Sequence, residues 1–196
     1  MTRRGWPLLA LLAVVVLNTG CDDSTRRYNE ALRQQLAGNM VGTVSELTRL
    51  AEAGHAGAQF RLAVMYGSGR GAPRDDRRAL HWVQQAAAQG HVGGEYFLAE
   101  FQLKGIGVRQ DWAQALAGFE RLAMRGYVPA QYRLAQLYEV GGQTEFARQW
   151  LLTAGGNGHR EAMERLVKAY EKGELGIAAD NAEAARWRRY LQHRAF

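Results

Sequence analysis

The feature that most constrains this chain is an internal repeat. Four segments of the 196-residue sequence open on a glycine, with spacings of 36, 36 and 32 residues: Gly54, Gly90, Gly126 and Gly158. The same register holds a leucine in every segment, at Leu62, Leu98, Leu134 and Leu166. A tyrosine follows at Tyr66, Tyr138 and Tyr170, and the second segment has Gln102 there. Such a period indicates an array of small units, none of which can bury its apolar face alone.

Both halves of each segment have helical periodicity. Residues 58–67 place Leu62, Ala63 and Tyr66 on one apolar stripe, and residues 76–89 carry a second stripe. Aspartates stand where an N-cap would accept from the free amides of the second helix, at Asp75, Asp111 and Asp180. Residues 24–53 predict one shorter hairpin that caps the array. No segment alternates with period two, so we expect an all-α chain without a sheet.

The first 20 residues are typical of a bacterial export signal. Arg3 and Arg4 precede an apolar run at residues 8–17, which is too short for a permanent span of about 20 residues. Cys21 is the chain's one cysteine and follows this run, so the segment resembles a lipoprotein signal in which the thiol is lipidated. Asn18 departs from that pattern, which usually has leucine there, and an ordinary signal with an unmodified cysteine is the alternative. The following Asp22-Asp23 resembles a signal for retention at the inner membrane, so we expect a periplasmic, lipid-anchored protein there.

The repeats resemble Sel1-like repeats, which are relatives of tetratricopeptide repeats. The matching residues are Ala130-Gln131, Leu134-Ala135 and Tyr138, then Gly105-Ile106-Gly107-Val108, Asp111 and Ala115, and Trp82, Ala86-Ala87 and Gly90. The resemblance implies a right-handed α-solenoid of antiparallel helix pairs whose first helices line a concave face. We therefore divide the chain into a signal peptide (1–20), an anchor and helical hairpin (21–53) and four repeats (54–89, 90–125, 126–157 and 158–196).

Charge and motifs argue against nucleic-acid binding, metal binding and catalysis. The formal charge of +6 falls to +4 when the two signal arginines are removed, and an exported protein meets no nucleic acid. One cysteine excludes a cysteine-rich zinc site, and His55, His91 and His159 recur in separate repeats, where we expect helix capping or corner packing. The glycine-rich stretches lack the Lys-Ser or Lys-Thr of a phosphate loop. We expect neither cofactor nor enzyme; the less favoured alternative is a hydrolase related to cysteine-rich repeat proteins, whose recurring cysteines are missing here.

Two rows of varying residues on the first helices form the candidate partner-binding site. The rows are Arg61, Phe97, Arg133 and Arg165, and Val64, Glu100, Gln136 and Lys168. A binding groove with basic and aromatic contacts is one interpretation. The solvated face of ordinary amphipathic helices is the other.

These features predict a non-catalytic, lipid-anchored periplasmic module that binds a protein partner. Small Sel1-like lipoproteins resemble immunity proteins that neutralise a toxic secreted effector, such as a membrane-attacking lipase, and we favour this role. The alternative is a scaffold or assembly factor for envelope machinery. Expected partners are therefore a protein and, through the lipid on Cys21, the membrane.

The lipid anchor is testable by substitution. Cys21→Ser removes the thiol that would accept the lipid, so the variant should lose labelled palmitate and remain unprocessed or mislocalised. Metabolic labelling followed by fractionation measures both. Wild-type protein that incorporates no palmitate would contradict the lipoprotein interpretation.

Overall fold

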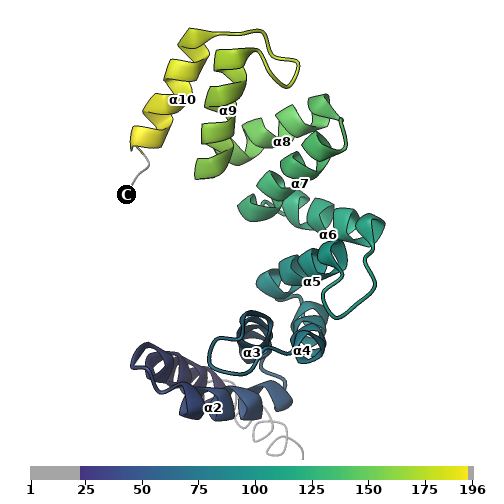
Figure 1. The fold of residues 1–196 in the computed structure, drawn as a ribbon. Helices are drawn as coiled ribbons and strands as arrows, with labels where there is room; N and C mark the ends of the chain where they lie inside the picture. Colours follow the sequence, from purple (N-terminus) through teal and green to yellow (C-terminus); the bar gives the residue numbers. More distant parts are fainter. Residues whose placement is uncertain (1–22, 194–196) are drawn as a thin grey trace, which may run out of the picture. The chain divides into compact units, whose positions relative to one another are not determined.

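The computed structural model describes residues 23–193, and over that range the chain forms helices and no strand (Figure 1). The expected all-α repeat solenoid is confirmed. The chain forms two compact units, of which the first ends at Gly94 and the second begins at Glu95. No helix in the described range is long and apolar enough to cross a membrane. The export signal and Cys21 lie outside the described residues.

The first unit is a run of helical hairpins. Residues 23–36 are helical and are followed by α2 (Met40–Glu52), α3 (Ala56–Ser68), α4 (Asp76–Ala88) and the beginning of α5 (Val92–Lys104). The α3 helix packs on both α2 and α4. Its core is made by the predicted stripes, with no exposed surface on Leu47, Leu62, Ala63, Ala79 and Val83.

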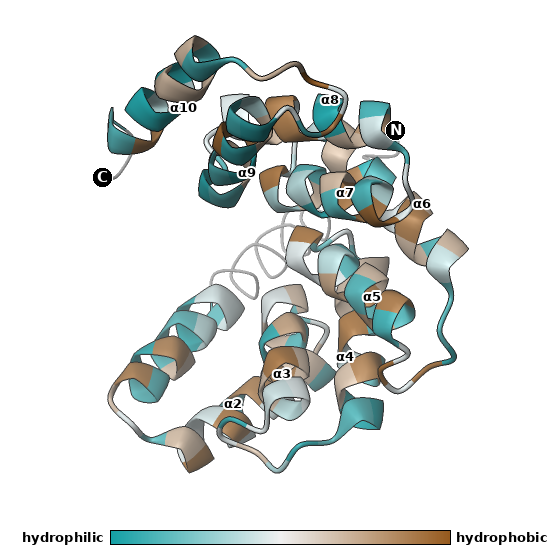
Figure 2. Cartoon of the chain, turned by 45° about the horizontal axis from the view of Figure 1, so that its top comes forward, coloured by the Kyte–Doolittle hydropathy of each residue, from teal (hydrophilic) through white to brown (hydrophobic). Residues whose placement is uncertain are grey.

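The second unit continues the same pattern. After the rest of α5 come α6 (Trp112–Met124), α7 (Val128–Val140), α8 (Thr144–Gly156), α9 (Arg160–Lys172) and α10 (Asn181–His193). From α6 onward each helix packs on the next. Hydrophobic and hydrophilic residues alternate around these helices (Figure 2), and the buried side chains include Phe119, Leu122, Leu134, Leu151 and Leu166.

The predicted aspartates start the second helices. Asp75 accepts from the amides of Arg77 and Arg78 at 3.0 Å, and Asp111 accepts from the Gln114 amide at 2.9 Å. Asp180 accepts from the first amides of α10 in the same way. These carboxylates satisfy amides that have no partner within the helix.

The first helices end in turns that need glycine in two different places. Gly69, Gly105 and Gly173 have φ of +69°, +72° and +70°, a left-handed conformation that side chains disfavour. The third repeat, which lacks four loop residues, instead has Gly141 at φ −75° and Gly142 at φ +72°. The shorter connection therefore moves the left-handed residue one position along the chain.

In the first three repeats, the residue at the tyrosine position contacts a matching residue on the second helix of its own repeat. Arg78 donates to the Tyr66 hydroxyl at 3.4 Å, and its guanidinium lies 5.5 Å from the ring centroid. The exception at Gln102 is matched by Gln114, which accepts its amide at 2.8 Å. The third repeat packs two rings, Tyr138 and Phe146, with centroids 5.4 Å apart. Where a repeat does not have the tyrosine–arginine pair, the two residues at these positions thus still contact each other.

One predicted core position differs from the others. Leu62, Leu134 and Leu166 are fully buried, whereas Leu98 is half-buried. Its helix, α5, buries Ala99, Phe101 and Leu103. In this repeat Phe101 and Leu103, which follow Leu98, are the large buried side chains of the first helix.

The buried leucine of the third repeat provides a test of the core. Leu134→Ala should lower the free energy of unfolding by about 2–5 kcal/mol, because it leaves a cavity among packed helices. Val140 on the same helix is 78% exposed, so Val140→Ala should change stability by less than about 0.5 kcal/mol. Chemical denaturation followed by circular dichroism measures both. Equal losses in the two variants would contradict this repeat register.

Candidate functional site

The second unit joins three of the eight candidate residues through hydrogen bonds and an ion pair. Arg133 on α7 places Nε 2.6 Å from Oε1 of Glu100 on α5, and its side chain is only 24% exposed. The same guanidinium donates to Gln136 Oε1 at 2.9 Å. Lys104, which sequence reasoning missed, lies 2.7 Å from the Glu100 carboxylate. This charge network, Lys104–Glu100–Arg133–Gln136, is thus formed before any partner arrives.

Arg165 lies between two carboxylates. Its guanidinium is 2.6 Å from Glu139 of α7 and 2.7 Å from Glu174, which follows α9. Hydrogen bonding to Glu139 raises the pKa of Arg165, so the group stays charged. The sequence did not predict a role for either carboxylate, although each lies next to a recurring tyrosine or glycine. Side-chain pairing between helices has no signature in a helical period.

The remaining candidates differ in their surroundings. Lys168 is exposed and has no ion pair among the described residues. In the first unit, Arg61 is half-buried and its Nε is buried without a hydrogen bond in the described range. Val64, three residues further along α3, is also half-buried. Phe97 is half-buried in the second unit, with its ring centroid 6.2 Å from that of Tyr96. Among the charged candidates, Arg61 and Lys168 are thus the two that no carboxylate of residues 23–193 neutralises.

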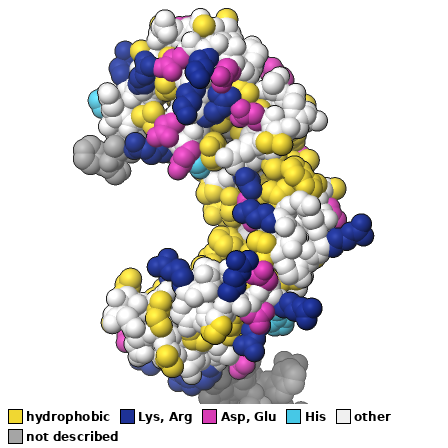
Figure 3. Space-filling model, in the orientation of Figure 1, with side chains coloured by type: hydrophobic (Ala, Val, Ile, Leu, Met, Phe, Trp, Pro, Cys, Tyr) yellow, Lys and Arg dark blue, Asp and Glu magenta, His cyan; other side chains and the backbone are white. Residues whose placement is uncertain are grey.

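Positive and negative side chains therefore alternate on the second unit. Figure 3 shows arginine and lysine beside aspartate and glutamate over its last helices. Mixed charge of this kind favours specificity over general attraction to acidic molecules.

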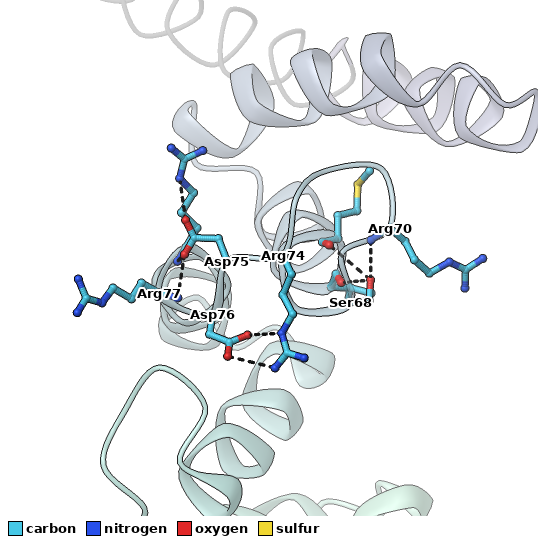
Figure 4. A network of polar contacts seen from close by, with 9 residues as sticks. Ser68, Arg70, Arg74, Asp75, Asp76 and Arg77 are labelled. Carbon is cyan, nitrogen blue, oxygen red and sulfur yellow. Dashed lines mark hydrogen bonds and ion pairs between the residues drawn. The ribbon is translucent and has the colours of Figure 1, made fainter.

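The loop between α3 and α4 carries a second polar network (Figure 4). Arg74 donates to both carboxylate oxygens of Asp76, at 2.9 and 3.1 Å, and this pairing lowers the pKa of Asp76. Ser68 Oγ donates to the Val64 carbonyl at 2.7 Å. These contacts fasten a loop and a helix start, and exposed ion pairs of this kind add little to stability.

The recurring histidines cap the first helices. Nδ1 of His55, His91 and His159 accepts from the amide three residues later, at 3.2, 3.1 and 3.4 Å. Each ring also lies 4.3–4.8 Å, between centroids, from an aromatic ring of the preceding first helix: Tyr28, Phe60 and Tyr132. The expected capping and corner packing is confirmed. The described residues contain no group of three metal-ligating side chains.

The repeat pattern, the paired helices and their capped corners match a known sequence family. Sel1 repeats match residues 56–91, 93–127, 128–159 and 160–187. The chain belongs to the Sel1 repeat family. Its members are generally non-catalytic scaffolds for protein interaction, and the fold is that of a protein-interaction module.

Solved structures show the same fold. A Sel1 repeat protein from Oxalobacter formigenes is 26% identical with a TM-score of 0.77, over 86% of this chain and 70% of that one. The protective antigen c5321 of uropathogenic Escherichia coli is 28% identical with a TM-score of 0.66, over 80% of this chain and 34% of that one. The immunity protein Pa5087 of Pseudomonas aeruginosa is 22% identical with a TM-score of 0.61, over 88% of this chain and 66% of its own. No curated protein matches the sequence.

The histidine caps make stability depend on pH. Burial lowers the pKa of His91 and of His159 below the ordinary value near 6.5, because the charged ring loses solvation. The unfolded chain then binds more protons than the folded one as the pH falls. The stabilisation is thus complete above the unfolded pKa and is lost as the pH falls through the folded value.

Replacing both caps with asparagine tests this. Asparagine caps helices without titrating, so the His91→Asn/His159→Asn variant should lose less melting temperature between pH 7 and pH 5 than the wild type. Thermal melts at a series of pH values measure the difference. Identical pH profiles would show that these two caps do not titrate with folding.

Proposed function

We propose that this protein is a lipid-anchored periplasmic immunity protein that binds and neutralises a toxic secreted effector without catalysis. Lipidation at Cys21 would hold the protein at the inner membrane, where it would meet an effector that enters the periplasm. This membrane address rests on the signal-like first 20 residues and on the position of the chain's one cysteine.

The observation that carries the proposal is the row of ordered charges on the first helices of the second unit. Arg133 and Arg165 are each fixed by carboxylates from neighbouring helices, with side chains 24% and 21% exposed. Side chains that are already ordered lose little rotamer freedom when a partner binds. Paired charges also penalise a partner whose own charges do not match. Such a surface suits one specific protein partner.

The fold neighbours agree with this role. Pa5087 and a second Pseudomonas aeruginosa immunity protein, PA5088, share the fold with this chain, the latter at a TM-score of 0.57 and 22% identity. At this identity the likeness concerns the fold, so the neutralising role of the present chain is inferred from its own surface and its expected address.

A competition experiment tests the role and does not require a purified effector. Cells that lack this gene should be killed when co-cultured with their parent strain, because they would have no protection against its effector. Re-expression of the wild-type gene should restore survival. Counting survivors of the deletion strain with and without the parent measures the effect.

Variants of the unpaired candidate residues sharpen the test. Arg61→Gln/Lys168→Glu should leave the cells sensitive, because it removes the two cations that no described carboxylate neutralises. Arg77→Glu is the matched control, since Arg77 is exposed on α4 and its side chain has no ion pair in the described range. Full survival of the deletion strain beside its parent would contradict the immunity role, and an envelope defect in monoculture would favour the scaffold alternative.

A further inference from the structure

The last three helices, α8, α9 and α10, enclose a cavity that the candidate rows do not include. It has a volume of about 440 Å³, within the range of about 300–1,000 Å³ for ligand pockets. We call it the α10 pocket. Its lining is mostly apolar and aromatic and includes Gly156, Met163, Trp187 and Tyr190.

The last two repeats differ from the earlier repeats at two places beside this pocket. The first difference, in the fourth repeat, is the loss of a polar link. In the three earlier repeats, the residue five positions after the opening glycine bonds to the residue just before the next one. The bonds are Gln89 to Gln59 at 2.6 Å, Arg125 to Glu95 at 2.6 Å and Asn157 to Gln131 at 2.9 Å. The fourth repeat has Met163 at this position, and Met163 lines the pocket.

The second difference lies at the end of α8. Gly155 and Gly156 stand where the first two full repeats have Ala87-Ala88 and Ala123-Met124. A Cβ on Gly155 would lie 3.0 Å from Leu166 Cδ1 and 3.1 Å from Trp187 Cζ3, so the packing of these two side chains explains this glycine. A Cβ on Gly156 would meet nothing within 4 Å. Packing within the chain therefore does not explain Gly156.

The rim of the pocket is charged and lies on α10. Arg186 is 3.3 Å from Glu183, and its guanidinium lies 5.9 Å from the centroid of the Tyr190 ring, which is 43% exposed. Arg188 pairs with Glu171. Arg189 is exposed, has no ion pair in the described range, and lies one helical turn from Arg186. One turn beyond Arg186, outside the residues that line the pocket, the helix thus offers a cation that no described carboxylate neutralises.

We propose that the α10 pocket receives a large apolar side chain from a protein partner, in a segment that also carries a carboxylate facing Arg189. The apolar walls suit an anchoring aromatic or leucine side chain, the kind of residue that dominates interfaces when it enters a pocket. The unpaired arginine supplies the charge complementarity for the neighbouring acid. This inference rests on the proposed protein-binding function and names the chemistry of the segment that is bound.

A peptide selection on the full chain tests the proposal. A random library of 12-residue peptides displayed on phage should enrich sequences with Trp, Phe or Leu close to Asp or Glu. Gly156→Met fills the open space and should weaken the selected peptides at least tenfold. Ala88→Met is the matched control at the same repeat position, and it should bind as the wild type does. Met124 occupies that position naturally and is 74% exposed, so methionine there is compatible with the fold.

Charge reversal and association state complete the test. Arg189→Glu should weaken the same peptides, and more so at low salt, because screening shortens the reach of exposed charges. Peptides that bind Gly156→Met as tightly as the wild type would overturn the proposal, as would a selection that enriches none. A wild-type dimer that Gly156→Met dissociates in sedimentation would assign the pocket to a second copy and also overturn it. Gly156→Met that retains full protection in co-culture would refute the pocket while leaving the immunity role in place.

Discussion

The burial of one helix's apolar stripe against the next supports everything else in this protein. Each helix from α2 to α10 is 13 residues long. Isolated helices of about 12–15 residues are marginal in water, so these depend on their neighbours for stability. The small residues of the stripes, such as Ala63, Ala135 and Ala162, are completely buried. The helix caps, the loops and the surface charges all hold their positions because this packing fixes the backbone beneath them.

The backbone was largely predictable because its determinants are local and recur. The repeat period predicted the helix pairs, and Asp75, Asp111 and Asp180 predicted where second helices begin. The histidine corners could be foreseen as capping or packing sites, since a ring beside a helix start has few other roles. The lipid anchor remains a prediction from the first residues, which lie outside the described range.

The candidate site was only partly predictable, because its side chains pair across helices. The sequence placed Arg133 and Glu100 in adjacent rows, but it offered no reason to expect their atoms 2.6 Å apart. Glu139 and Glu174, which hold Arg165, belong to no recurring pattern. The α10 pocket lies where a polar link and a side chain are missing. The sequence shows both differences, but only the packing of the neighbouring helices shows that they lie beside one cavity.

The unequal connections between paired helices bear on how the chain folds. Residues 141–143 join the helix pair of the third repeat, whereas residues 69–75, 105–111 and 173–180 join the helix pairs of the other three repeats. Closing a loop costs more entropy as it lengthens, by about 0.6 kcal/mol for each doubling. In the second unit, connections of three residues join α6 to α7, α7 to α8 and α8 to α9 (125–127, 141–143 and 157–159), so this run of helices closes at the lowest entropic cost and is the natural nucleus there. Substitutions in its core would slow folding, whereas those in α10 would mainly speed unfolding, and refolding kinetics distinguish the two.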